Sequence, residues 1–411
     1  MPNTVLNPSV VAKVAVRILD NELVMANRVY RAYENEFDKK VNGYDVGDTI
    51  SIRRPTDFTV RSGRTASVND VVEGKTTLVI DQQQGIDFSF TSKELTLNIS
   101  ELAERVIRPA MVQLANKIDR DVMTLYKDVW NWVGTPGSTI DAFADFAKAP
   151  ERLDLGAVPQ ERVGVLSPTD HWAIAGAQTA LFMQNVAQQA YRKGRIGEIG
   201  DVDTYKSQNV QTLTTGTRDN TTPLVKGTQS TTWALSKDTG TMTLNTDGWD
   251  ASVTIKQGEV FTIAGVFAVN PVSKATLPHL QQFVVKSDVT ADGTTTNTTA
   301  LTISPPIITT GAFQTVSAVA ADDAAITIMG TASTNYAQNL VFHKNAFALA
   351  IVPMVKPPGA VSVARESYKG INVRLIPYYD GSGDTSSWRL DVLYGFKTVD
   401  ARLATRLSGT P

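Results

Sequence analysis

The chain has 411 residues, of which 42% are hydrophobic, so it contains enough apolar side chain to bury a core of ordinary size. Its 39 lysines and arginines nearly balance 41 aspartates and glutamates, which excludes binding to nucleic acid or anionic lipid through bulk charge. The absence of cysteine excludes disulfides, thiol nucleophiles and thiolate metal sites. The chain has no long apolar run and no pattern of an export signal, so we expect a soluble, cytoplasmic protein without a membrane partner.

The first predicted elements are a helix and a projecting pair of strands. Apolar residues at three- and four-residue spacing predict an amphipathic helix over 9–38. The alternating runs TISIRRP and TTLVIDQQQGIDFSF predict two long strands around an extended loop. This segment has few apolar anchors and should project from the body. It carries four arginines: Arg53, Arg54, Arg61 and Arg64. Such side chains need either water or the carboxylates of a partner, and the sequence leaves both possibilities open.

A long helix and a mixed layer follow. An apolar face that persists over 100–132 predicts a spine helix, and Pro109 predicts that this helix kinks or restarts there. Its acidic residues Asp119 and Asp121 are expected on a solvated or intersubunit face. Two helical patterns and the strand RVGVLS in 141–200 then predict a mixed α/β lobe.

The composition changes between residues 211 and 335. This segment is rich in threonine, contains one arginine, Arg218, and repeats short β-type runs bounded by turn residues. We therefore predict an all-β module, either a sandwich or a small barrel. Chain of a different character flanks it on both sides, as expected for a domain inserted into a loop whose ends lie close together.

No pattern of residues announces chemistry. The three histidines His171, His279 and His343 lie far apart, without acidic neighbours at metal-ligand spacing. The glycines of GRIGEIG lack the lysine of a phosphate-binding loop, and no serine stands in a nucleophile elbow. The sequence thus predicts no catalytic residue, no cofactor and no metal site, and the chain is not expected to be an enzyme.

The order of elements resembles that of a tailed-bacteriophage major capsid protein, in the short-tailed-phage branch that carries an inserted β-barrel. The resemblance rests on GDTISIRRP, ISELAERVIRPAMVQLANKIDRDVM, GEIGDVDTYKSQNV, FHKNAFALA and LYGFKTVDARLATRL, which occur in this order. It implies an α+β fold in five parts. These are an N-terminal arm (1–40), an extended β loop (41–95), a spine helix with the first part of an axial lobe (96–210), an inserted β-barrel domain (211–335) and the rest of the lobe with peripheral strands (336–411).

The resemblance also implies a function and partners. Copies of the chain would assemble into hexamers and pentamers of an icosahedral head, first as a procapsid and then as a shell around packaged double-stranded DNA, which it contacts non-specifically. The implied partners are further copies of the chain, a separate scaffolding protein and a portal protein, with a decoration protein left open. The chain would be assembled in the cytoplasm of the host bacterium and reside in the virion.

Two groups of intersubunit contacts are implied. The four arginines of the extended loop would reach over adjacent subunits. A long loop of the inserted domain would bridge capsomers, and by position it corresponds to SKDTGTMTLNTDGWDASV. Its candidate ion-pair partners are Lys237, Asp238, Asp247 and Asp250.

Three other functions compete with this interpretation. A bacterial nanocompartment shell of the same fold would enclose an enzyme instead of DNA, but such shells usually lack an inserted β module. A β-rich surface adhesin would need an export signal. An enzyme of unknown type would need a pocket that no motif announces.

Overall fold

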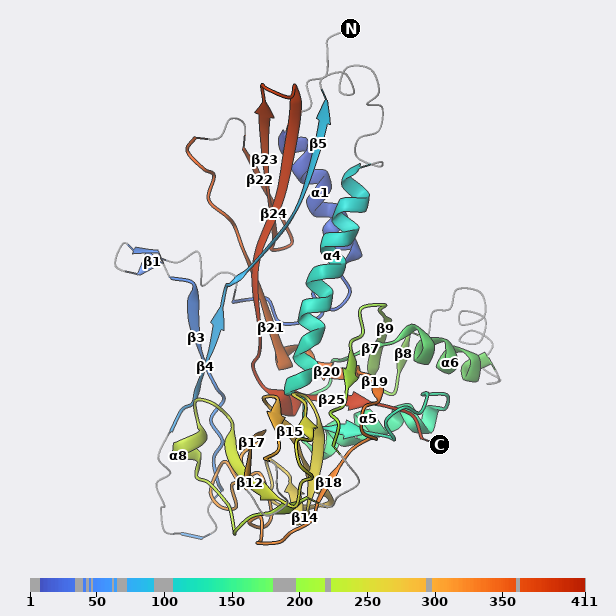
Figure 1. Ribbon diagram of the computed structural model, residues 1–411, viewed down its shortest axis with the longest axis vertical. Coiled ribbons are helices and arrows are strands. Elements are labelled where there is room, and N and C mark those ends of the chain that lie inside the picture. Colours follow the sequence, from blue (N-terminus) through green and yellow to red (C-terminus); the bar gives the residue numbers. More distant parts are fainter. Residues whose placement is uncertain are drawn as a thin grey trace. The chain divides into compact units, whose positions relative to one another are not determined.

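The computed structural model describes residues 8–33, 40–41, 44–45, 47–60, 63–64, 72–91, 106–179, 197–218, 223–292, 298–359 and 363–410. It divides into two compact units, shown with their labelled elements in Figure 1. Unit 1 comprises Met1–Ser51, Thr77–Val122 and Phe347–Lys397. Unit 2 comprises Ile52–Thr76, Met123–Ala346 and Thr398–Pro411.

Unit 1 is built on an antiparallel sheet on which helix α1 packs. Among the described residues the strand order is β21-β24-β23-β22, with β5 paired along β24. The strands are β5 (Gln82–Thr91), β21 (Phe347–Val352), β22 (Ala364–Tyr368), β23 (Ile371–Asp380) and β24 (Thr385–Thr398). The helix α1 (Pro8–Glu22) packs on β22 and β23. Along β23 every second residue, Ile371, Val373 and Leu375, is fully buried, as the two-residue period of strands requires.

The predicted arm helix is shorter than expected. Helix α1 ends at Glu22, and turns follow as far as Val29 although several of their side chains are buried. The side-chain amide of Asn27 donates to the carbonyl oxygens of Asp20 and Leu23 at 2.8 and 3.2 Å. In a continuing helix these two carbonyl oxygens would accept backbone N–H groups. The Asn27 amide takes the place of those groups and so helps to end the helix.

The kink or restart of the spine helix at Pro109 stays a prediction, because the π-helical residues 106–107 run directly into the α-helix that follows. Helix α4 (Arg108–Met123) begins with the proline in its first turn, where a missing backbone N–H removes no helical bond. The helix ends earlier than predicted, because a 3-10 turn, η2 (Thr124–Asp128), follows directly. Residues 100–105 lie outside the described residues.

Unit 2 contains the mixed lobe. In its described part the strand order is β6-β25-β20-β7-β9-β8. The strands are β6 (Trp132–Val133), β7 (Arg162–Leu166), β8 (Glu198–Ile199), β9 (Val202–Lys206), β20 (Asn339–His343) and β25 (Ala404–Leu407). The predicted strand RVGVLS is confirmed as β7, which is buried along its whole length. Helices α5 (Phe143–Leu155) and α6 (Pro168–Thr179) contribute Phe146, Leu153 and Ile174 to the lobe core.

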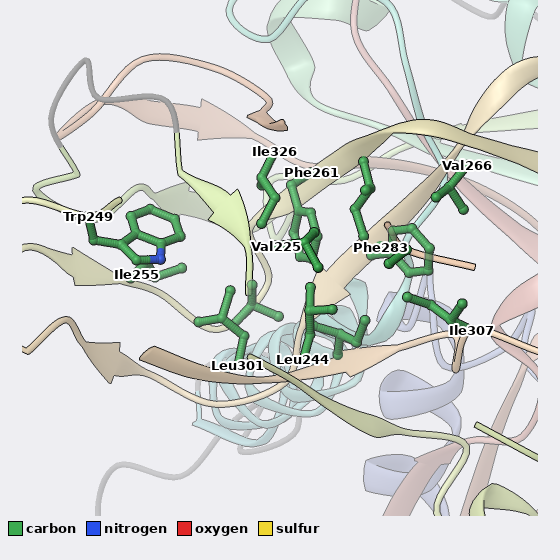
Figure 2. Close-up of a cluster of buried hydrophobic side chains, with 14 of the residues drawn as sticks. Val225, Leu244, Trp249, Ile255, Phe261, Val266, Phe283, Leu301, Ile307 and Ile326 are labelled. Atoms are coloured by element: carbon green, nitrogen blue, oxygen red, sulfur yellow. The ribbon is translucent and has the colours of Figure 1, made fainter. Parts of the chain in front are cut away.

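Unit 2 also contains a closed β-barrel. Its strand order is β11-β12-β17-β15-β14-β18 among the described residues, and a bridge between Leu224 and Ala325 brings the two outer strands together. The strands are β11 (Leu224–Val225), β12 (Met242–Asp247), β14 (Val260–Val269), β15 (Thr276–Val285), β17 (Thr299–Ser304) and β18 (Ile326–Ile328). Closure leaves no long unpaired edge. Figure 2 shows the interior, where side chains including Leu244, Phe261 and Phe283 form the core.

The chain enters and leaves the barrel side by side. Strand β10 (Thr212–Thr214) pairs with β19 (Asn335–Ala337), and Leu213 lies opposite Tyr336. Arg218, the one arginine of the threonine-rich segment, is buried beside this entrance. Its Nη1 donates to Glu259 Oε2 at 2.8 Å, so the buried cation is paired.

The remaining short elements complete the chain. They are β1 (Lys40–Val41) paired with β2 (Tyr44–Asp45), β3 (Thr49–Arg53) with β4 (Lys75–Val79), β13 (Thr254–Ile255) with β16 (Val289–Thr290), the helix α8 (Trp233–Ser236), and the 3-10 turns η3 (Lys344–Ala346) and η4 (Ala401–Leu403). In the described part of the chain, no helix is long and apolar enough to span a bilayer.

Candidate interaction site at the root of the extended loop

The described residues 52–60 and 72–76 form the root of the extended loop in unit 2. Residues 52–60 are its outgoing limb, and residues 72–76 are its returning limb. The backbone N–H of Arg54 donates to the carbonyl of Gly74 at 2.8 Å, which joins the two limbs. Arg53 Nη1 lies 3.2 Å from Glu73 Oε2, but the side chains are 82% and 42% exposed. An ion pair this exposed contributes little to stability.

The returning limb lies against α8 of the barrel. Trp233 Nε1 donates to the carbonyl of Val72 at 2.9 Å, and the Trp233 ring stacks on Phe313 with centroids 3.8 Å apart. The backbone N–H of Lys75 donates to Asp238 Oδ1 at 3.1 Å. A Cβ atom on Gly74 would come within 2.3 Å of the Lys237 carbonyl oxygen, so this close approach requires glycine.

The outgoing limb lies against the next residues of the barrel. The half-buried guanidinium of Arg54 lies beside Gly240 and donates to the carbonyl of Thr239 at 3.4 Å. Burial lowers the pKa of this guanidinium, while the charges of Asp400 and Asp238 act in the opposite direction. Arg54 is therefore partly withdrawn from solvent and less available to a partner than Arg53.

The C-terminal segment of unit 2 holds the same limb from another side. Arg402 Nη1 donates to Asp57 Oδ2 at 3.0 Å, and its Nη2 donates to Asp400 Oδ2 at 2.8 Å. The two carboxylates, Asp400 most strongly, raise the pKa of Arg402 above its usual range. Nearby, burial lowers the pKa of Lys274, against the charge of Asp57. The root is thus held by both the barrel and the C-terminal segment.

The structure brings together only part of the predicted contact set. Arg53, Arg54, Lys237 and Asp238 meet at the root, within one chain. Arg64 is exposed in the same segment, and Arg61 lies outside the described residues. The root also uses Asp57, Trp233 and Arg402, which the sequence analysis did not single out. No local pattern marks them, because their partners lie far away along the chain.

The predicted bridging loop over 236–253 is wrong as a description of secondary structure. Its middle is strand β12, which pairs with β11 and β17, and Leu244 lies fully buried in the barrel core. The alternation in MTLNTD places one face of the strand inside, which fixes it in the barrel. Asp247 ends this strand opposite Leu224, and Asp250 follows in the next turn.

The expected surface position of the acidic pair in the spine helix is also wrong. Asp119 is 1% exposed and accepts backbone N–H groups from Val24 and Ala26. Asp121 accepts the hydroxyl proton of Tyr394 at 2.5 Å. Both carboxylates are therefore engaged within unit 1.

The groups that could support chemistry are few in the described structure. Its residues include no cluster of three or more histidine, aspartate or glutamate side chains placed to hold a metal ion. Burial, together with the charge of Arg152, lowers the pKa of His279 to about 4, and burial also lowers the pKa of His343. The contacts at the loop root hold its two limbs against the barrel and the C-terminal segment of unit 2.

Comparison with known proteins identifies the family. The model of the family described as P22 coat protein, gene protein 5, matches residues 3–406. The major capsid protein of Acyrthosiphon pisum secondary endosymbiont phage 1 is 21% identical over 387 residues, which are 89% of this chain and 90% of that protein. A solved structure of Mycobacterium phage Che8 is 15% identical, with coverage of 93% of this chain and 90% of that chain and a TM-score of 0.49. The capsid structure of cyanophage P-SCSP1u is 10% identical, with coverage of 89% and 84% and a TM-score of 0.44. Since the family model spans nearly the whole sequence, the chain belongs to the P22 coat protein family.

Proposed function

We propose that the chain is the repeating subunit of an icosahedral phage head, arranged in hexamers and pentamers that form first a procapsid and then a DNA-filled shell. The family match over residues 3–406 carries this proposal, because it makes the chain a phage major capsid protein with an α+β capsid fold. Such a protein is a structural component of the virion that associates with further copies of itself. The same match favours a phage coat over a nanocompartment shell.

The root of the extended loop supports a role in assembly. A projecting segment can contact a neighbouring copy reproducibly only if its base has a fixed direction, and here two sides of unit 2 hold that base. Arg53, Arg61 and Arg64 are then the candidates for contact with carboxylates of an adjacent copy. Arg54 supports the loop from within its own chain, because its guanidinium lies against Gly240.

Of the predicted contact residues of the barrel, some hold the loop root and others stay candidates for contacts with another copy. Asp238 accepts a hydrogen bond from the returning limb, and the Lys237 carbonyl lies against Gly74. Asp247 and Asp250 lie at the other end of β12 and stay candidates for contacts between capsomers. The ammonium group of Lys237 stays a candidate as well. We further propose the five-part organisation with a barrel inserted at 211–335, supported by the pairing of β10 with β19 where the chain enters and leaves.

Several partners belong to the same proposal. A head of this kind requires a scaffolding protein to direct assembly and a portal protein through which double-stranded DNA enters, and it allows a decoration protein. Assembly would take place in the cytoplasm of the host. Contact with DNA would be non-specific, because the 39 basic and 41 acidic residues leave no large positive field.

Assembly of the purified chain tests the function. Sedimentation velocity and negative-stain electron microscopy, with the phage's scaffolding protein added, should show closed shells of uniform diameter. The double variant Arg53→Glu, Arg64→Glu should stay folded by circular dichroism and fail to close shells. The matched control Lys256→Glu, Lys344→Glu changes two exposed lysines elsewhere and should assemble normally. A wild-type chain that stays monomeric would overturn the function, whereas normal shells from the loop variant would overturn only the loop contact.

A further inference from the structure

The outer strand of the lobe sheet has a buried residue whose backbone groups face away from the sheet. Strand β6 lies at the end of the lobe's strand order in the described part of the chain, and its residue Trp132 is 1% exposed. The N–H of Arg406 on β25 donates to the carbonyl of Asn131 at 2.8 Å. The N–H of Ser408 donates to the carbonyl of Val133 at 3.0 Å. Because β25 bonds to both neighbours of Trp132, the N–H and the carbonyl of Trp132 itself point to the other side.

A side chain of the barrel binds both of these backbone groups. Gln282 lies on β15 and is 7% exposed. Its Oε1 accepts the N–H of Trp132 and its Nε2 donates to the carbonyl of Trp132, both at 2.7 Å. A primary amide carries the same kinds of donor and acceptor as a peptide group, so Gln282 pairs with Trp132 as a residue of a neighbouring strand would. The barrel thereby satisfies two buried backbone groups of the lobe.

A fully buried arginine crosses the same junction from the lobe to the barrel. Arg406 lies opposite Trp132 in the pairing of β25 with β6. Its Nη1 donates to the carbonyl of Gly258 at 2.7 Å, in the turn before β14 of the barrel. Its guanidinium carbon lies 5.2 Å from the centroid of the Tyr126 ring and 5.5 Å from that of the Trp132 ring. The lobe and the barrel thus each supply a buried side chain that bonds to the backbone of the other.

Two further contacts join the barrel to the rest of unit 2. Lys286, directly after β15, is paired with Asp128 of η2, and these side chains are 24% and 22% exposed. Asn270, directly after β14, donates from Nδ2 to the carbonyl of Leu155 in α5 at 2.9 Å. The ion pair is partly open to solvent, which weakens it relative to the buried amide pair of Gln282.

We propose that Gln282 couples the barrel to the lobe, so that the two parts of unit 2 open and unfold together. The chain enters and leaves the barrel through β10 and β19, which are three residues long each. Opening of the barrel alone must break both bonds of Gln282 and uncover a buried junction, and this penalises partial unfolding. The proposal concerns the single chain, so a failure of the assembly proposed above leaves it unaffected.

Native-state hydrogen exchange of the full chain in increasing urea tests the coupling. The readout is the protection factor of peptides from barrel strands β12 and β17 and from lobe strands β7 and β20. In the wild type these peptides should approach global unfolding along one common dependence on urea. Gln282→Met keeps the length of the side chain and removes its amide. In this variant the protection of barrel and lobe peptides should differ by about tenfold, as the loss of one buried hydrogen bond requires.

Gln281→Met is the matched control. Gln281 is 8% exposed on the same strand, and its amide donates to the carbonyl of Gln282 at 2.7 Å. Whatever this substitution does to overall stability, barrel and lobe peptides should keep a common curve, because the pairing with Trp132 remains. Separate curves in this control would show that coupling does not depend on the Gln282 amide.

Two separate curves in the wild type would overturn the proposal, and so would a common curve in Gln282→Met. If Gln282→Met does not fold, Gln282→Asn decides the question. Its amide is one methylene shorter and cannot make both bonds to Trp132, so a common curve in that variant would likewise contradict the coupling.

Discussion

Asp57 and Arg402 are 345 residues apart along the chain, yet the Asp57 carboxylate accepts a hydrogen bond from Arg402 Nη1 at 3.0 Å. The arginine shares its other donors with Asp400. This contact links the outgoing limb of the extended loop to the segment before the final strand β25. The root of the loop is therefore held by the C-terminal end of the lobe as well as by the barrel.

Replacing Arg402 by methionine should lower the free energy of unfolding by about 1–2 kcal/mol, because it leaves two partly buried carboxylates without their cation. Urea denaturation measures the change. The control Arg53→Met breaks the exposed pair with Glu73 and should cost less than about 0.5 kcal/mol. Equal losses in the two variants would mean that Arg402 does not stabilise the loop root.

Replacing Gly74 by alanine should separate the returning limb from α8, because the new Cβ would lie 2.3 Å from the Lys237 carbonyl oxygen. Backbone atoms cannot yield at that distance without a shift of the chain, so the Trp233 bond to Val72 should weaken. A red shift of Trp233 emission, in a variant that keeps Trp233 as its one tryptophan, would report this. Gly47→Ala is the control, since nothing lies within 4 Å of its added Cβ. An unchanged emission in Gly74→Ala would contradict the contact.

Replacing Leu244 by alanine should destabilise the barrel by about 2–5 kcal/mol, because this side chain is fully buried in its core. The neighbouring Thr243→Ala changes the exposed face of the same strand and should cost well under half as much. Unfolding in urea, followed by the buried Trp249, compares the two. If both substitutions lowered the free energy of unfolding by a similar small amount, residues 242–247 would form a loop and not a barrel strand.

His279 should make the chain less stable in mild acid. Burial first, and then Arg152, lowers its pKa from 6.5 to about 4 in the folded chain. Between these values the unfolded chain binds a proton that the folded chain does not, so stability falls as the pH drops from 6.5 toward 4. Asp119 acts in the opposite direction, because its pKa is raised on folding.

A comparison of variants therefore isolates the contribution of His279. The wild type should lose more unfolding free energy between pH 7 and pH 5 than His279→Gln does, as measured by urea denaturation at both pH values. A variant that loses as much as the wild type would show that His279 titrates normally.

Sequence periodicity predicted which helices and strands form better than it predicted where they end. The strand RVGVLS and the β character of 211–335 follow from alternation and β-branched residues, which are local properties. The end of α1 depends on the side chain of Asn27, and the end of α4 on a 3-10 turn, and neither interrupts the apolar pattern.

The site was predicted less completely, for a different reason. The arginines of the loop stay predicted contact residues, because they were chosen from a basic segment with few apolar anchors. The contacts of Arg54 with Thr239 and Gly240, and the pairing of Asp57 with Arg402, join segments that only the fold brings together. The resemblance suggested a bridging loop by position, but the alternation around Leu244 decided in favour of a barrel strand.

An electron cryo-microscopy reconstruction of particles purified from cells that make this chain and its scaffolding protein would show directly whether the chain builds a head. We expect closed icosahedral shells in which every copy keeps the Asp57–Arg402 pair and places Arg53 and Arg64 against an adjacent copy. Cells that make soluble, folded chain but no closed particle would contradict the claim that this chain builds the head.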